Sequence, residues 1–119
     1  MKAITILGMN VYPYLNFQDL INDAIINKKM LLSVNAEILL KADDHIKEIY
    51  NNNIGYPDGV GAVMALQKKG IKDAIKLPGC ELWLEIIKQF HNTKSFYFVG
   101  STEEVILSTI NKLKSEFPN

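Results

Sequence analysis

Residues 30–61 decide the fold, and they read MLLSVNAEILLKADDHIKEIYNNNIGYPDGVG. The run from Met30 to Val34 is apolar without alternation, which is typical of a strand covered on both faces. Residues 36–51 repeat apolar side chains at helical spacing, and residues 54–56 form a second, minimal strand. A strand, a helix and another strand in this order predict a βαβ crossover with parallel strands.

Each of these two strands ends at a short polar side chain. Asn35 follows the first strand and is predicted to cap the helix over 36–51. Asp58 follows the second strand and is predicted to cap a further helix over 60–69. Because the carboxyl ends of parallel strands share one edge of the sheet, we expect Asn35 and Asp58 at the edge where open α/β sheets bind ligands.

The rest of the chain continues the alternation of strands and helices. Strands are predicted at 2–9 and at 95–99, where Ser-Phe-Tyr-Phe-Val is the clearest strand pattern in the chain. One helix is predicted over residues 17–28, a second is predicted to begin at Gly79, and a third is predicted to begin at Thr102. The predicted class is therefore α/β, a Rossmann-like and mostly parallel sheet with helices on both faces.

Length and composition indicate one ordinary globular domain, residues 1–119, because this length suits a single core. Thirteen basic residues, all of them Lys, balance thirteen acidic ones, which argues against nucleic acid as a partner. One cysteine and two histidines argue against a zinc site and an internal disulfide. We expect a cytoplasmic protein without a metal or another cofactor.

Three predicted strand-to-helix junctions carry the candidate chemistry, namely Ser33-Val34-Asn35, Pro57-Asp58-Gly59 and Gly100-Ser101-Thr102. A helix N-terminus offers free N–H groups and a partial positive charge, which suit a phosphate or a sugar hydroxyl. For any one junction taken alone, ordinary helix capping is favoured over a functional role, because Asn and Asp are favoured caps. The glycines around Asp58 would let the backbone approach a ligand, so both interpretations stay open there.

Four stretches together resemble a known family: LSVNAE at 32–37, YPDGVG at 56–61, KLPGCEL at 76–82 and FVG at 98–100. Their order and spacing are similar to those of the WecG/TagA/CpsF glycosyltransferases over nearly the whole chain. The resemblance implies metal-independent, inverting transfer of N-acetylmannosamine or a related sugar. The implied donor is a UDP-sugar, and the implied acceptor is a sugar on a polyprenyl diphosphate, in teichoic acid or capsule synthesis.

The resemblance also implies roles for individual residues. Asp58 matches the proposed general base, and Ser33 and Asn35 match polar residues of the sugar pocket, where the family usually has Thr in place of Ser33. Lys76 matches a position where the family usually has Arg, so it would meet a diphosphate as a point charge. The remaining substrate-binding candidates are the glycines of the matching motifs, Gly59, Gly79 and Gly100.

Family members continue well beyond this length, so the resemblance covers their N-terminal half and implies a natural short form, a truncated gene product or a fragment. Part of the uridine pocket and a basic C-terminal segment that reaches the membrane would then have to be supplied separately. Two functions follow from this. One is a glycosyltransferase that acts at the inner face of the membrane, either alone or self-associated. The other is a non-catalytic module that binds a nucleotide-sugar or a partner protein.

Overall fold

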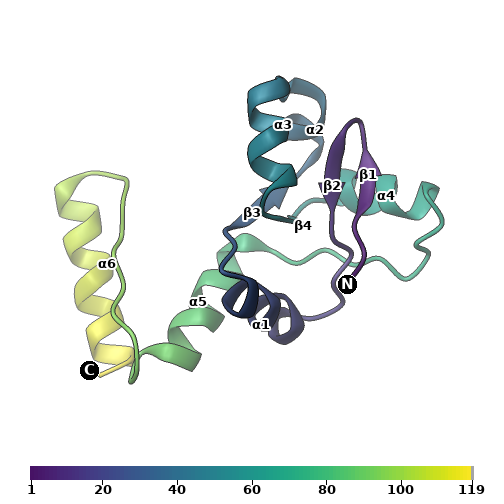
Figure 1. The fold of residues 1–119 in the computed structure, drawn as a ribbon. Helices are drawn as coiled ribbons and strands as arrows, with labels where there is room; N and C mark the ends of the chain where they lie inside the picture. The colour runs from purple at the N-terminus through teal and green to yellow at the C-terminus, as the bar shows by residue number, and fades with distance from the viewer. Residues whose placement is uncertain (119) are drawn as a thin grey trace. The chain divides into compact units, whose positions relative to one another are not determined.

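The computed structural model describes residues 1–118, which form two compact units, Met1–Leu82 and the chain from Trp83 onward. Figure 1 shows their helices and strands. In chain order these are β1 (Ile4–Ile6), β2 (Met9–Val11), α1 (Phe17–Asn27), β3 (Leu31–Val34), α2 (Ala36–Lys41), α3 (Asp44–Asn51), β4 (Ile54–Pro57), α4 (Val60–Lys68), α5 (Gly79–Phe90) and α6 (Glu103–Glu116).

The parallel pair predicted from residues 30–61 is confirmed. β3 and β4 run parallel, and Ser33 lies opposite Tyr56 in their register. The pairing continues past the strand ends, since the Asp58 N–H donates to the Val34 carbonyl at 3.0 Å. The α/β class is confirmed, and the carboxyl ends of both strands lie at one edge, as the crossover requires.

The single strand predicted over 2–9 is wrong, because this segment turns back on itself. β1 and β2 form an antiparallel hairpin in which Ile6 lies opposite Met9. The two turn residues, Leu7 and Gly8, have φ angles of 50° and 84°, the left-handed values that a tight hairpin needs. The hairpin lies beside β4, where the Tyr12 N–H donates to the Gly55 carbonyl at 2.8 Å.

The single helix predicted over 36–51 is also wrong. α2 ends at Lys41, and Ala42 takes an extended conformation with ψ at 127°. Asp43 then caps α3, because its carboxylate accepts from the Ile46 N–H at 2.9 Å. A short acidic side chain that can bond its own downstream backbone favours such a restart over an uninterrupted helix.

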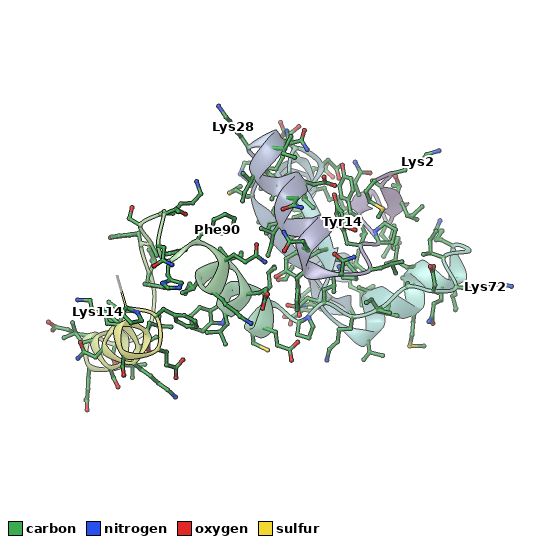
Figure 2. All side chains as sticks on the ribbon, turned by 90° about the horizontal axis from the view of Figure 1, so that it is seen from below. Lys2, Tyr14, Lys28, Lys72, Phe90 and Lys114 are labelled. Carbon is green, nitrogen blue, oxygen red and sulfur yellow. The ribbon has the colours of Figure 1, made fainter. Side chains whose placement is uncertain are left out.

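One buried hydrophobic cluster of the first unit lies between the hairpin, β3, α2 and α4. Its buried members are apolar side chains from these elements, together with one from the loop after α4, namely Ile6, Met9, Val11, Val34, Leu39, Ala62, Leu66 and Ala74. α1 is held to the loop after β2 by a hydrogen bond from the Tyr14 hydroxyl to Asp23, and burial raises the pKa of Tyr14. Figure 2 shows Tyr14 among other side chains, whereas Lys2, Lys28 and Lys72 extend outward.

Gly55 lies where the hairpin and the parallel pair come closest. A Cβ atom at this position would lie 2.9 Å from the Asn10 carbonyl oxygen and 3.0 Å from Cγ2 of Val34. We therefore expect Gly55→Ala to lower the free energy of unfolding by about 2 kcal/mol, because overpacking of this kind forces backbone to shift. Urea denaturation followed by circular dichroism measures this, and a change below about 0.5 kcal/mol would contradict the close packing.

The strand predicted at 95–99 is wrong. This segment has no regular secondary structure, and the side chains of Tyr97 and Val99 are 91% and 84% exposed. In the second unit Phe98 instead packs edge-on against Trp83, with ring centroids 6.3 Å apart. An aromatic and apolar pattern favours a strand, but it cannot provide the neighbouring N–H and C=O groups that a strand requires.

Candidate functional site

The first unit brings the junctions after β3 and β4 side by side. A Cβ atom on Gly59 would lie 3.2 Å from Cβ of Asn35, and one on Gly61 would lie 2.7 Å from Cβ of Ala36. The starts of α2 and α4 can approach this closely because Gly59 and Gly61 of the second junction face the start of α2. Asn35 and the Asp58-Gly59 turn therefore share one edge of the parallel pair, as the sequence predicts.

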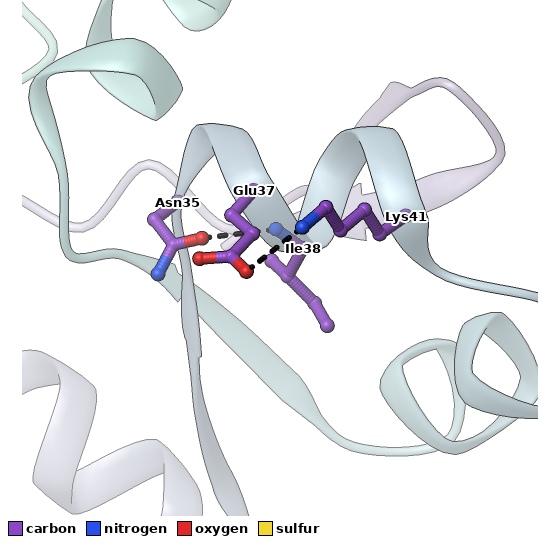
Figure 3. Close-up of polar contacts among 4 residues, drawn as sticks. All are labelled: Asn35, Glu37, Ile38 and Lys41. Carbon is purple, nitrogen blue, oxygen red and sulfur yellow. Dashed lines mark hydrogen bonds and ion pairs between the residues drawn. The ribbon is translucent and has the colours of Figure 1, made fainter.

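Asn35 is the N-cap of α2, as predicted. Its side-chain oxygen accepts from the Ile38 N–H at 2.9 Å, and its amide nitrogen points away from the helix (Figure 3). The Glu37 and Lys41 side chains form an ion pair at 3.3 Å on the exposed surface of this helix. Capping thus uses the amide oxygen of Asn35 and leaves its nitrogen to donate to a ligand.

Ser33 and Asn35 line one shallow hollow at the end of β3. The hollow has a volume of about 260 Å³, and its other walls come from α2 and α3, namely Glu37, Ile38, Lys41 and Tyr50. The Tyr50 hydroxyl donates to the Ser33 carbonyl at 2.7 Å, and burial raises the pKa of Tyr50. The two predicted sugar-pocket residues therefore face the same space, which is bounded by polar groups of both charges.

Asp58 does not cap α4, so that prediction is wrong. Gly59 is the N-cap residue of α4 and makes no side-chain capping bond. The Asp58 carboxylate instead accepts from the backbone N–H of Gly79 at 2.9 Å. Because Gly79 is the first residue of α5, Asp58 satisfies one of the unpaired N–H groups at the start of a helix 21 residues away in the chain.

The segment before α5 is held along the end of β4. The Leu77 N–H donates to the Pro57 carbonyl at 2.7 Å, and the Leu77 side chain is buried. Lys76 precedes this anchor and is exposed, so its ammonium group is free to meet an anion in solvent. The structure thus brings Asp58, Lys76 and Gly79 onto neighbouring backbone segments, which their separation in the sequence does not reveal.

Tyr56 is a residue of this region that the sequence analysis does not single out. Its side chain is only 5% exposed, and its hydroxyl lies beside Gly79. Burial, and after it the negative charge of Asp58, raises the pKa of Tyr56 to about 12. The signal in the sequence is its position two residues before Asp58, in the strand that leads to that residue.

The raised pKa of Tyr56 predicts a pH dependence of stability. The neutral phenol is favoured in the fold, so its contribution is complete below pH 10 and is lost as the pH rises toward about 12. Between these values we expect the free energy of unfolding of the wild type to fall more steeply than that of Tyr56→Phe. Denaturant titrations at a series of pH values test this, and parallel curves for the two proteins would contradict it.

Gly100, the remaining predicted site residue, belongs to the second unit. Gly100 and Ser101 have φ angles of 129° and 62°, and Thr102 caps α6 by accepting from the Val105 N–H at 3.3 Å. The backbone therefore needs glycine or a strained residue at this turn. The place of Gly100 in a binding site stays a prediction.

The edge of the β3–β4 pair offers a defined set of chemical groups. It holds one carboxylate with a fixed orientation, an amide donor, an exposed ammonium group and glycines that let backbone come close to a ligand. A carboxylate of this kind can take a proton from a hydroxyl, and the cation can bind a phosphate. Within residues 1–118, no three potential metal-ligating side chains gather, and no helix has the length and apolar character of a membrane span.

Comparison with known proteins gives a family match over almost the whole chain. Residues 4–119 match the glycosyl transferase WecG/TagA/CpsF family. The chain is also 27% identical over 119 residues to the N-acetylglucosaminyldiphosphoundecaprenol N-acetyl-β-D-mannosaminyltransferase of Bacillus subtilis (strain 168). That similarity covers 90% of this chain and 46% of the relative, so the chain spans about half the relative's length. No solved structure shows significant similarity to the chain.

Proposed function

The chain belongs to the WecG/TagA/CpsF glycosyl transferase family, and from this we propose that it moves N-acetylmannosamine or a related sugar from a UDP-sugar to a sugar on a polyprenyl diphosphate. The name of the Bacillus subtilis relative supports the sugar and the lipid-linked acceptor. The observation that carries the proposal is the orientation of Asp58, whose carboxylate is fixed by Gly79 at the edge where Asn35 also lies.

In the proposed reaction Asp58 is the general base. It takes the proton from the acceptor hydroxyl as that oxygen attacks the anomeric carbon of the donor. A bond forms between the acceptor oxygen and the anomeric carbon, the bond from that carbon to the diphosphate breaks, and UDP leaves with the electron pair. Attack opposite to the leaving group inverts the anomeric centre, and no metal ion takes part.

The other site residues bind the substrates in this proposal. Lys76 neutralises charge on the diphosphate, while Ser33 and Asn35 bind hydroxyl or acetamido groups of the donor sugar. Backbone at Gly59 and Gly79 approaches the ligand closely because no side chain intervenes. The proposed setting is the cytoplasmic face of the membrane during teichoic acid or capsule synthesis.

The structural role of Asp58 favours one alternative, a module that holds a nucleotide-sugar or a partner protein without chemistry. Under this alternative, Asp58 would serve only as the cap of α5. The two proposals therefore differ in whether bound donor is consumed.

Calorimetry combined with a transfer assay separates these proposals. We expect the pure chain to bind both UDP and UDP-N-acetylmannosamine, and to release UDP when a polyprenyl-diphosphate-linked N-acetylglucosamine is added. Mass spectrometry of the lipid product measures transfer. Binding without transfer would favour the binding module, and the absence of binding by either nucleotide would contradict both the glycosyltransferase and a module that holds a nucleotide-sugar.

A further inference from the structure

Asp58, Tyr56 and Gly79 meet at one point of the first unit. A Cβ atom built on Gly79 would lie 2.8 Å from the Tyr56 hydroxyl oxygen and 3.1 Å from Oδ2 of Asp58. These separations are shorter than nearly all real contacts of a Cβ atom. Only glycine therefore fits between the two side chains without moving them.

The two oxygens of the Asp58 carboxylate are in different surroundings. Oδ1 accepts from the Gly79 N–H at 2.9 Å, whereas Oδ2 lies over the Cα face of Gly79 on the side of the Tyr56 hydroxyl. Gly79 is itself fixed, because the Leu77 N–H bonds to the Pro57 carbonyl at 2.7 Å two residues earlier. The carboxylate thus has one oxygen held by a backbone N–H group.

We propose that Gly79 and Tyr56 are positioning residues for Asp58. The Gly79 N–H holds Oδ1, and the bare Cα of Gly79 with the hydroxyl of the buried Tyr56 side chain forms the wall beside which Oδ2 accepts the proton of the acceptor hydroxyl. This inference rests on the proposed function, and it adds to it a reason for glycine at position 79 other than contact with substrate. A carboxylate misplaced by even 1 Å loses much of its rate advantage in a transfer reaction.

The proposal makes a specific prediction about added bulk. In Gly79→Ala the new methyl group pushes Asp58 and Tyr56 apart, so we expect kcat to fall by about 30-fold or more, with KM for the UDP-sugar within about threefold of the wild type. Tyr56→Phe removes the hydroxyl that the methyl group would meet at 2.8 Å. In the Gly79→Ala and Tyr56→Phe double variant, we therefore expect kcat to recover by about threefold or more relative to Gly79→Ala.

Gly70→Ala is the matched control for a glycine that is replaced away from the site. Gly70 has a φ angle of 101° and has no atom within 4 Å of a built Cβ, so alanine there strains the backbone without touching Asp58. Its folded fraction should fall, while kcat per folded molecule should stay within about twofold of the wild type. A loss of kcat in Gly70→Ala equal to that in Gly79→Ala would overturn the positioning role.

Nuclear magnetic resonance tests the same inference without any transfer reaction. The full chain has seven glycines, and the Gly79 amide signal in an ¹⁵N-labelled sample is identified by its loss from the glycine region in Gly79→Ala. We expect this amide to exchange slowly with solvent, and Asp58→Ala to speed its exchange by about tenfold or more. An amide whose exchange is unchanged in Asp58→Ala would overturn the inference.

The two assays keep this inference separate from the proposed function. If the wild type transfers sugar and Gly79→Ala transfers equally well, the positioning role is wrong and the function stands. If the wild type does not transfer sugar, the proposed function fails. The contact between Gly79 and Asp58 is then judged by the amide exchange alone, where protection that depends on Asp58 supports it and its absence overturns it.

Discussion

Asp58→Asn is expected to reduce sugar transfer by about 10³-fold while leaving the fold intact, because a general base contributes factors of this size. Asparagine keeps an oxygen that can accept from the Gly79 N–H, at 2.9 Å in the wild type, so the start of α5 remains capped. The amide cannot take a proton from the acceptor hydroxyl. The measurement is the initial rate of lipid-linked product, with circular dichroism as the check on folding.

Asp73→Asn is the matched control for the loss of one carboxylate. Asp73 lies exposed in the segment between α4 and α5, close in sequence to the site but without a capping role there. Its transfer rate should remain within about twofold of the wild type. Asp58→Asn with wild-type turnover would show that Asp58 caps α5 and does no chemistry.

Lys76→Ala is expected to weaken UDP binding by about tenfold or more, since a charge-assisted contact with phosphate contributes roughly 1.5–3 kcal/mol. Lys76→Arg should bind UDP at least as tightly as the wild type, because a guanidinium group can meet the diphosphate with two hydrogen bonds. Calorimetric titration with UDP at a fixed salt concentration measures both variants.

Lys72→Ala separates a specific contact from a general loss of positive charge. Lys72 is exposed on the same segment and extends outward from the first unit (Figure 2). We expect its UDP affinity to match that of the wild type within about twofold, because solvent and salt screen a charge that does not touch the ligand. Equal losses in Lys72→Ala and Lys76→Ala would contradict a site at Lys76.

The sequence predicts well those parts of the fold that depend on local pattern and on neighbouring elements. The apolar run at 30–34 and the minimal strand at 54–56 pair in parallel as predicted, and Asn35 caps the next helix. Both outcomes follow from short-range rules: continuous apolar residues favour a covered strand, and Asn favours an N-cap.

The error at Asp58 arises where a distant group competes with the local pattern. Asp58 has the sequence pattern of an ordinary N-cap, but its carboxylate accepts from the N–H of Gly79 instead. No local feature of the sequence predicts that bond. The turn at Leu7-Gly8 interrupts an apolar run that reads as one strand. The pattern at 95–99 has strand propensity without a ladder partner, so it stays irregular.

In the candidate site, too, some features follow from the sequence pattern and others depend on contacts between distant residues. Asn35 and Asp58 could be placed at one edge from the crossover rule alone. The close approach of Gly79 to Tyr56 and Asp58 could not be predicted in this way, because it depends on the path of residues 76–79 along the end of β4. That path is held by the Leu77 bond to Pro57. Tertiary contacts of this kind are not encoded in the spacing of residues within one element.

The most direct test of the central claim, a donor site at the carboxyl edge of β3 and β4, is an amide chemical-shift titration of the ¹⁵N-labelled chain with UDP-N-acetylmannosamine. We predict that the largest shifts fall at residues 33–35, 58–61 and 76–79, and that they saturate together. The opposite end of the pair has its own polar hollow of about 370 Å³, lined in part by Asn27, Lys29 and Asn52. Shifts concentrated at that hollow, or none at all, would contradict the account.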